Sequence, residues 1–382
     1  MPDSPHGQCR WRGQRPLCPG SSLGCAGHGH RCGRDGRMRQ DAVRERLDES
    51  NAARPVDGSA RGWPAEAEAM LFALSEGEGI SLASARERAG GARELDALRQ
   101  DWDALGLPIR ERAAQLVWVA DILGLSADRI AGHLSALDVS CAVRVEALTD
   151  STNAQLLADA AAGAVAAPSA LLCECQRAGR GRRQRVWQGR FGESILMSVL
   201  LHCARPLAEL PGVAIVAGLA VHRALSELGA GGLAVKWPND LLLHDAKLAG
   251  ILVESTGRAG QLVVGIGMNW SGAADLSARL GRPVAALKPA LPDGVDRNRV
   301  AAALLAALVK DVQRFADDGL RPFLPAFARH DALAGRTVRV MTADAMSRYG
   351  TACGLAPDGG LKVDHGGTRA VYHSADVSVV LA

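Results

Sequence analysis

Four apolar runs lie close together in the second half of the chain, and they constrain its fold more than any other feature. The runs occupy residues 233–237, 241–243, 247–254 and 261–269. The turns at 238–240 and 244–246 are far shorter than the roughly dozen residues that a parallel crossover needs, so neighbouring runs must pair antiparallel. This stretch therefore predicts a ladder of antiparallel strands.

Helices and strands on both sides of the ladder indicate a larger mixed domain. Helical periodicity is present at 151–164, 214–228 and 297–318, and short apolar strands are expected at 171–175 and 194–201. From Gly335 the pattern changes to short strands broken by Gly pairs, which predicts a small β-barrel. The chain is placed in the α/β (α+β) class, with a mixed or antiparallel main sheet.

The segment before residue 140 predicts a small helical domain. Helices are expected at 65–75, 81–89, 92–105 and 126–137, with a strand pair at 107–111 and 115–119. Three helices and a strand pair are the plan of a winged helix-turn-helix, here a degenerate one. We therefore expect this domain at 63–140, the main domain at 141–332 and the barrel at 333–382.

Residues 1–62 have a different composition, rich in Gly, Arg, Pro, Ser and Cys without apolar periodicity. Such a segment cannot bury enough surface to offset its ordering entropy, so we expect a disordered low-complexity extension. An alternative is an upstream extension of a chain that starts near Met38 or Met70. Cys25, His28, His30 and Cys32 fit no standard zinc spacing.

The chain lacks a run of about 18 apolar residues and a secretory apolar region at its start. Its nine Cys are an odd number, which argues against a disulfide framework. We expect a soluble cytoplasmic protein, with no membrane partner, whose downstream Cys are reduced and mostly buried.

An Arg-rich loop follows the strand at 171–175. In QRAGRGRRQRVW, which spans 176–187, Gly179 and Gly181 permit close backbone approach, and the Arg forks match phosphate and carboxylate oxygens. The alternative is a disordered basic tract that contacts RNA. A dinucleotide fingerprint is excluded, because Gln184 stands in place of the third Gly and no helix follows.

Two lysines flank one turn of the ladder. Lys236 opens KWPND and Lys247 opens KLAGILVE, although only five of the 44 basic residues are Lys: 236, 247, 288, 310 and 362. The chain uses Arg at nearly all of its basic positions. A Lys inside a motif therefore indicates that a compact ammonium is required there. The alternative is a purely structural β-hairpin that happens to have a Lys at each strand end.

Glycines alternate in GIGMN, at Gly265 and Gly267. Alternate strand positions share one face, so a flat ligand can lie against the bare backbone there. A β-bulge is the alternative.

Taken together, these motifs resemble the biotin–protein ligase family. The match consists of STN at 151–153, QRAGRGRRQRVW at 176–187, KWPNDL at 236–241, KLAGILVE at 247–254 and GIGMN at 265–269. Order and spacing fit over about residues 143–382, and lipoate ligases, which share the fold, lack the paired KWPNDL and KLAGIL blocks. The resemblance implies a biotin- and ATP-binding catalytic domain related to class II tRNA synthetases at 141–332, followed by an SH3-like domain.

The resemblance also implies roles for individual residues. Biotin would be bound by Ser151, Thr152, Asn153, Gln176, Gly179, Arg180, Gly181, Arg182, Ser198 and Lys247. ATP would be bound by Arg180, Arg182, Lys236, Asn239 and Asn269, and catalysis would rest on Lys247, Arg182, Asp240 and Lys236. Magnesium would accompany ATP, without an assigned ligand set.

Several positions depart from the family pattern. Gln184 replaces a loop Gly, Gly189 and Arg190 stand where Ser-Pro is usual, and Leu196 stands where an aromatic residue often packs on biotin. The pair at 375–376 is Ala-Asp, where Gly-Glu is common. These changes bear on affinity more than on the class of reaction.

The function implied is ATP-dependent formation of biotinyl-5′-AMP and transfer of biotin to a lysine of the biotin carboxyl carrier protein of acetyl-CoA carboxylase. The alternative is a bifunctional ligase that also represses biotin-synthesis genes, and homodimerisation is left open. The third helix carries two Arg and four acids, a net charge of −2, and no Lys precedes residue 236. Because phosphate contacts need cations, the sequence predicts weak or absent operator binding.

Overall fold

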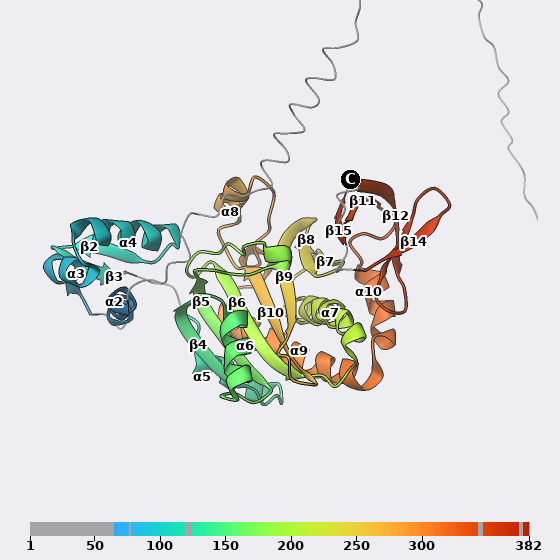
Figure 1. The fold of residues 1–382 in the computed structure, drawn as a ribbon, viewed down its shortest axis with the longest axis horizontal. Coiled ribbons are helices and arrows are strands. Elements are labelled where there is room, and N and C mark those ends of the chain that lie inside the picture. The colour runs from blue at the N-terminus through green and yellow to red at the C-terminus, as the bar shows by residue number, and fades with distance from the viewer. Residues whose placement is uncertain (1–64, 76–77, 120–123, 343–346, 374–376, 382) are drawn as a thin grey trace, which may run out of the picture. The chain divides into compact units, whose positions relative to one another are not determined.

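The computed structural model describes residues 65–75, 78–119, 124–342, 347–373 and 377–381 (Figure 1). The expected extension at 1–62 lies outside these ranges, as does the pair at 375–376. None of the helices in the described ranges has both the length and the apolar content needed to cross a bilayer.

A seven-stranded mixed sheet forms the centre of the main domain. Its strands are β4 (Ala142–Thr149), β5 (Ser169–Gln176), β6 (Ser194–His202), β7 (Leu233–Lys236), β8 (Asp240–Leu243), β9 (Ala246–Ser255) and β10 (Gln261–Asn269). The order is β4-β5-β6-β10-β9-β8-β7, with β4 and β5 parallel and every other pair antiparallel. The antiparallel ladder predicted over 233–269 is therefore confirmed.

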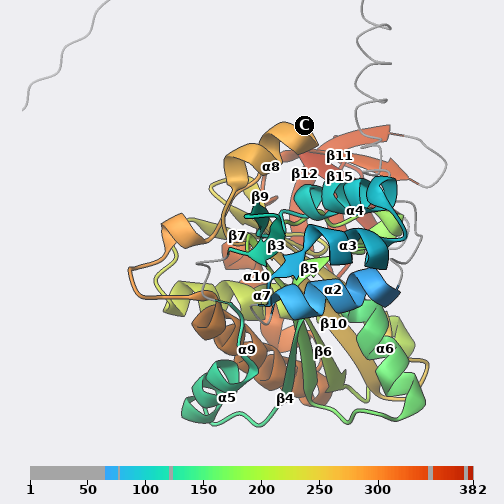
Figure 2. The same cartoon turned by 90° about the vertical axis from the view of Figure 1, so that its left-hand side faces the viewer.

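The two faces of this sheet pack on different helices because successive strand residues point to opposite sides. Leu172, Val199 and Val264 join the large core beneath α7 (Pro211–Glu227) and α9 (Arg297–Asp318). Their neighbours in sequence, Leu171, Leu200 and Val263, pack instead against α6 (Thr152–Ala162). Figure 2 shows α9 and α6 on opposite sides of β6 and β10.

The N-terminal part has the three helices and the strand pair that were predicted. Its helices are α2 (Ala65–Ser75), α3 (Leu82–Ala89) and α4 (Ala92–Ala104), and β1 (Ile80–Ser81), β2 (Ile109–Arg112) and β3 (Gln115–Trp118) form a sheet in the order β1-β3-β2. Ser81 caps α3 by accepting a hydrogen bond from the Ser84 backbone, and Gly90 ends the helix with a positive φ. Met70, Leu95 and Trp102 form the centre of a separate core.

The helix expected at 126–137 does not pack with this N-terminal core. It is α5 (Ala127–Ala136), whose Ile130 and Leu134 are fully buried in the main core, where α5 contacts α9. The residues before α5 are also held by the main domain. Leu125 N–H donates to Glu174 Oε1 (2.6 Å) and Ser126 N–H donates to Asn298 Oδ1 (2.7 Å). Grouping this helix with 63–140 is therefore at odds with its packing.

A second, separate sheet ends the chain. Its five antiparallel strands are β11 (Thr337–Thr342), β12 (Ser347–Leu355), β13 (Leu361–Asp364), β14 (Arg369–Tyr372) and β15 (Val377–Leu381), in the order β14-β13-β12-β11-β15. The predicted fold class, α/β (α+β) with a mixed main sheet, is confirmed. The small β-barrel predicted after it is this five-stranded antiparallel sheet, whose hydrogen-bonded order has β14 and β15 at its two ends. Trp237 Nε1 donates to the Gly359 carbonyl (3.0 Å), which ties this sheet to the KWPND turn.

Several elements were not predicted. Among them are β1, β4, α8 (Ala273–Leu280) and α10 (Leu324–His330). The loop from 270 to 290 that contains α8 closes one side of the site described next.

Candidate active site

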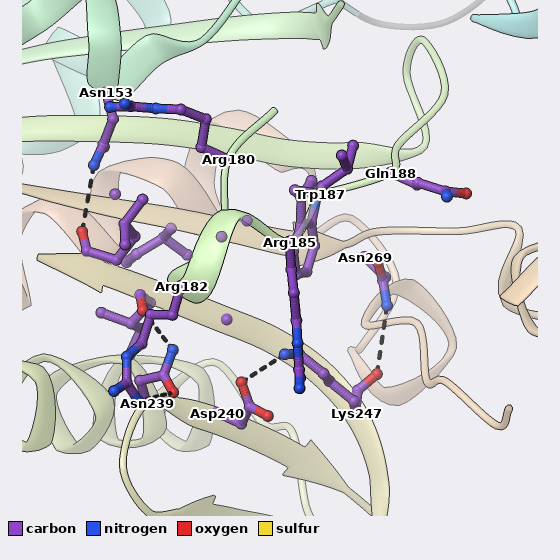
Figure 3. A pocket seen from close by; sticks show the side chains of 18 of the residues that line it. Asn153, Arg180, Arg182, Arg185, Trp187, Gln188, Asn239, Asp240, Lys247 and Asn269 are labelled. Carbon is purple, nitrogen blue, oxygen red and sulfur yellow. Dashed lines mark hydrogen bonds and ion pairs between the residues drawn. The ribbon is translucent and has the colours of Figure 1, made fainter. Parts of the chain in front are cut away.

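A cavity of about 240 Å³ opens on the α6 face of the sheet, beside the N-terminus of α6 (Figure 3). The described residues that line it include seven cationic side chains and one carboxylate. The cations are Arg180, Arg182, Arg183, Arg185, Lys236, Lys247 and Arg282, and the carboxylate is Asp240. Such an excess of positive charge in a concave site favours an anionic ligand.

One end of the cavity is polar and almost fully buried. Ser151 caps α6, which places Thr152 and Asn153 in the first helical turn. Gln176 Oε1 accepts from Thr152 N–H (2.8 Å), and Ser198 Oγ lies 2.7 Å from Thr152 Oγ1 and 2.5 Å from Asn153 Oδ1. The structure thus brings together five residues for which the sequence predicted contact with biotin, although they come from β5, β6 and α6.

The floor of the cavity is the bare strand face predicted from GIGMN. Gly267 of β10 pairs directly with Gly250 of β9. The ring of Trp187 lies over both, so that a Cβ at Gly267 would come within 2.5 Å of Trp187 Cε2 and one at Gly250 within 3.2 Å of Cζ3. The sequence predicted a flat ligand on this face, whereas an indole of the chain itself covers it.

The Arg-rich loop folds back on itself above the floor. Trp187 N–H donates to the Gly179 carbonyl (2.9 Å), and Gly181 N–H donates to the Arg185 carbonyl (2.7 Å). A Cβ at Gly179 would meet the Trp187 carbonyl oxygen at 2.7 Å. Gly179 is therefore required for close packing within the loop itself, a reason that the sequence did not reveal.

Two arginines leave this loop in different directions, as Figure 3 shows. Arg180 reaches toward Asn153 and pairs with Glu254, whereas Arg182 Nη1 donates to Asn239 Oδ1 (3.3 Å) at the KWPND turn. Burial lowers the pKa of Arg182, and the neighbouring charge of Arg183 lowers it further. A partly desolvated cation gains strongly from an anionic partner.

The two motif lysines face the same carboxylate. Lys247 Nζ lies 2.6 Å from Asp240 Oδ1, and Asp240 pairs across the hairpin with Lys236. Burial lowers the pKa of Lys236, as do the charges of Lys247 and Arg282, while Asp240 opposes the change. The three charged motif residues that the sequence singled out thus form one cluster.

Asn269 serves the backbone around the site. It is buried, and its Nδ2 donates to the carbonyls of Ala285 (2.9 Å) and Lys247 (3.4 Å). These bonds fix the 270–290 loop against β9. The sequence predicted ATP contact for Asn269, and the structure adds this anchoring of a cavity wall.

The model of the biotin/lipoate A/B protein ligase family matches residues 145–269. The bifunctional ligase/repressor BirA of Escherichia coli is 33% identical over 258 residues, which is 67% of this chain and 78% of that protein. BirA of Salmonella typhimurium is 31% identical over 320 residues, covering 81% of this chain and 96% of that protein.

The chain belongs to the biotin–protein ligase family. The biotin–[acetyl-CoA-carboxylase] ligase of Mycobacterium tuberculosis is also 35% identical over 238 residues, or 61% of this chain and 87% of that protein. The structure of the Aquifex aeolicus biotin protein ligase in complex with biotin and ATP superposes with a TM-score of 0.55 at 23% identity. The superposition covers 63% of this chain and 99% of the Aquifex aeolicus chain, so the two proteins share the fold.

Sequence reasoning missed several lining residues of this ligase. Arg282, Leu276, Leu280 and Val284 come from the 270–290 loop, which has no family motif, and Met197 precedes Ser198 on β6. The described residues contain no cluster of three or more His, Cys, Asp or Glu side chains suited to hold a metal.

Proposed function

We propose that this ligase activates biotin with ATP to biotinyl-5′-AMP in the cytoplasm and then transfers biotin to a lysine of the biotin carboxyl carrier protein of acetyl-CoA carboxylase. The observation that carries the proposal is the cavity lining. A buried polar end, suited to a small uncharged head group, leads to a region whose lining includes seven cations and one carboxylate. That arrangement suits a ligand with a neutral head and an acidic tail.

The first step brings the biotin carboxylate to the α-phosphate of ATP, so two anions must approach each other. Arg180, Arg182 and Lys247 neutralise that charge, and Lys247 contributes most, because a preorganised donor is worth roughly 2.7–4 kcal/mol at a transition state. Fixing both substrates in one orientation lowers the barrier by a further ~7–11 kcal/mol. Since the mixed anhydride hydrolyses readily, the Arg-rich loop retains it and excludes water.

Magnesium fits the cavity as a companion of ATP. Mg²⁺ in nucleotide sites usually takes one or two protein carboxylates together with phosphate oxygens. Asp240 is the carboxylate that the cavity provides, and it would hold the ion. When bound, the ion neutralises phosphate charge.

The second step needs a neutral amine on the carrier. A lysine of ordinary pKa is about 3.4 units from deprotonation at pH 7, which costs roughly 4.6 kcal/mol. Asp240 lies against Lys247 and beside Lys236, so it can orient an incoming amine by hydrogen bonding and charge pairing. We assign Asp240 this orienting role rather than full proton abstraction.

Intact-mass measurement tests the proposal directly. The full chain is incubated with biotin, ATP, magnesium and a carrier domain. The expected result is one added biotin on the carrier, with release of AMP and pyrophosphate. A carrier that gains no mass at saturating substrates would overturn the proposal.

A second candidate function, repression of transcription, is favoured by the helices and strand pair at 65–119 and by the names of the BirA relatives. Charge opposes it. In α4, Arg99 is already engaged with Glu111 (3.1 Å), and the helix carries four acids. We infer weak or absent operator binding, with or without a homodimer. A nanomolar gel shift that depends on biotinyl-AMP would contradict this inference.

A further inference from the structure

Glu254 lies just beyond the cavity, on the strand that also carries Lys247. Side chains of β9 alternate, so Glu254 shares a face with Gly250 and Leu252, which line the cavity. Its pairing partner on β10 is Val263, which packs against α6. Glu254 therefore stands at the boundary between the cavity and the packed part of this face.

The carboxylate of Glu254 binds two residues that come from different elements. Asn153 Nδ2 donates to Oε2 (2.8 Å), and Arg180 Nη2 donates to Oε1 (3.0 Å) and Oε2 (2.9 Å). The side chain of Glu254 is only 28% exposed, so these contacts are partly shielded from water. One carboxylate thus joins the polar end of the cavity to the Arg-rich loop.

The first contact sets the orientation of the Asn153 amide. An ionised carboxylate can only accept hydrogen bonds, so the amide must turn its NH₂ group toward Glu254. The amide oxygen then faces Ser198 Oγ, at 2.5 Å. Rotating the amide by half a turn would bring its oxygen against the carboxylate, with no hydrogen between them.

This orientation is passed on to the hydroxyl groups of the polar end. Ser198 has one hydroxyl hydrogen, and with the Asn153 oxygen facing it that hydrogen is drawn to Asn153. Thr152 Oγ1 lies on the other side of Ser198, 2.7 Å away, and 3.1 Å from Gln176 Oε1. Glu254 lies outside the cavity lining, yet it decides which of these groups donate hydrogen bonds into the cavity and which accept them.

The second contact holds Arg180 on the wall of the cavity when no acidic ligand is present. A guanidinium paired with a carboxylate is kept in a defined direction, and a ligand carboxylate or phosphate competes for it. Because Arg180 is 44% exposed, it can exchange partners without a large desolvation cost.

We propose that Glu254 is a positioning residue for biotin activation, which fixes the hydrogen-bonding polarity of the biotin pocket through Asn153 and holds Arg180 ready for the acidic tail. The inference rests on the proposed ligase function and on the roles proposed for Asn153 and Arg180. Glu254 itself touches no reacting atom.

The first test compares Glu254→Gln with wild type. Glutamine keeps the shape but removes the charge, and either end of its amide can face Asn153. We expect the KM for biotin to rise about tenfold, the scale of one charge-assisted hydrogen bond, while the thermal unfolding midpoint stays near wild type. Glu227→Gln is the matched control, because Glu227 pairs with Arg223 (3.3 Å) on an exposed surface of α7. An unchanged KM for biotin in Glu254→Gln overturns the inference.

The second test reverses the pair. Asn153→Asp places two carboxylates against each other and should abolish measurable biotin binding by calorimetry. Adding Glu254→Gln to that variant restores a donor opposite a carboxylate, so the double variant should bind biotin at least tenfold more tightly than Asn153→Asp alone. Equal or weaker binding by the double variant also overturns the inference.

Failure of the ligase function would look different. In that case wild type and the Glu227→Gln control would form no biotinyl-AMP. Failure of the present inference leaves wild type active and removes only the difference between wild type and Glu254→Gln.

Discussion

The two faces of the seven-stranded sheet are built from the same strands but carry different side chains. Toward α7 and α9, neighbouring strands present Leu172, Val199 and Val264, all without exposed surface. The residues next to Val199 and Val264 in sequence, Ser198 and Gly265, point to the opposite face, toward α6. They pair with each other across β6 and β10, and Asn153 lies beside them. The first face is mainly hydrocarbon, with the buried ion pair between Glu174 and Arg297 as its charged contact, and the other is interrupted by polar and missing side chains.

This difference shows how a single sheet separates stability from recognition. Hydrocarbon burial stabilises the fold without regard to direction, so the α7 and α9 face can supply most of the free energy of unfolding. Hydrogen bonds and charges are directional, and those that line the cavity lie on the α6 face where a ligand can reach them. Substitutions on the two faces should therefore affect different measurements.

The largest expected effect is the loss of activity in Lys247→Arg. A guanidinium is wider than the ammonium that lies 2.6 Å from Asp240, so it cannot keep both that contact and the ligand contact. We expect kcat/KM to fall roughly 10²–10³-fold, measured by carrier biotinylation. Lys310→Arg, at the surface of α9, is the matched control, and Lys288→Arg and Lys362→Arg should also be silent. Equal activity in all four variants would remove the argument from the scarcity of Lys.

Leu305→Ala tests the opposite face. Leu305 of α9 is fully buried in the main core, and its truncation leaves a cavity. The free energy of unfolding should fall by about 2–5 kcal/mol in urea titrations, while the remaining folded protein keeps near-normal kcat/KM. A drop in kcat/KM that exceeds the drop in stability would break the separation between the faces.

Arg182→Gly should change the fate of the intermediate more than its formation. Arg182 links the Arg-rich loop to Asn239 at the KWPND turn, and its loss weakens loop closure. We expect about tenfold more free biotinyl-AMP, trapped with hydroxylamine, because one charge-assisted contact is lost. Lys247→Arg, which should form little adenylate, is the comparison. No increase in trapped adenylate would mean that another element retains it.

The smallest effect is a pH dependence on the α7 side. Burial lowers the pKa of His222, and His330, whose ring centroid lies 3.9 Å away, lowers it further. The unfolded chain therefore binds the proton more readily, so stability is present above the ordinary pKa near 6.5 and falls as pH drops toward the folded value. The unfolding midpoint should decrease more between pH 7.5 and 5.5 in wild type than in His222→Gln. Parallel pH profiles would contradict this.

Elements that carry their own start and stop signals were predictable from the sequence. The helix expected at 297–318 has the same bounds as α9. These bounds were predictable because Asp296 caps the start of the helix and Gly319 follows its end. The strand expected at 261–269 is β10, and the short turns fixed the pairing of β7, β8 and β9. By contrast, α10 is a seven-residue helix with Pro325 in its first turn and lacks a clear period.

Contacts between distant segments could not be read from local patterns. The spacing of Ile130 and Leu134 indicates a buried helix face but not that α9 covers it. Trp187 belongs to a recognised motif, yet nothing in the motif places its ring on Gly267. Glu254 contacts residues 74 and 101 positions away, so its part in the site emerges only from the folded chain.

The neighbour relationship between β6 and β10 also has a consequence during synthesis on the ribosome. β6 ends at His202 and β10 begins at Gln261, which is 59 positions later (261 minus 202). At roughly 5–20 residues per second, one edge of β6 waits about 3–12 s for its partner. That edge is long and apolar, which is the kind that attracts other chains. Slow translation through 203–260 should therefore raise aggregation of the nascent protein, even though β6 lies between β5 and β10 in the finished sheet.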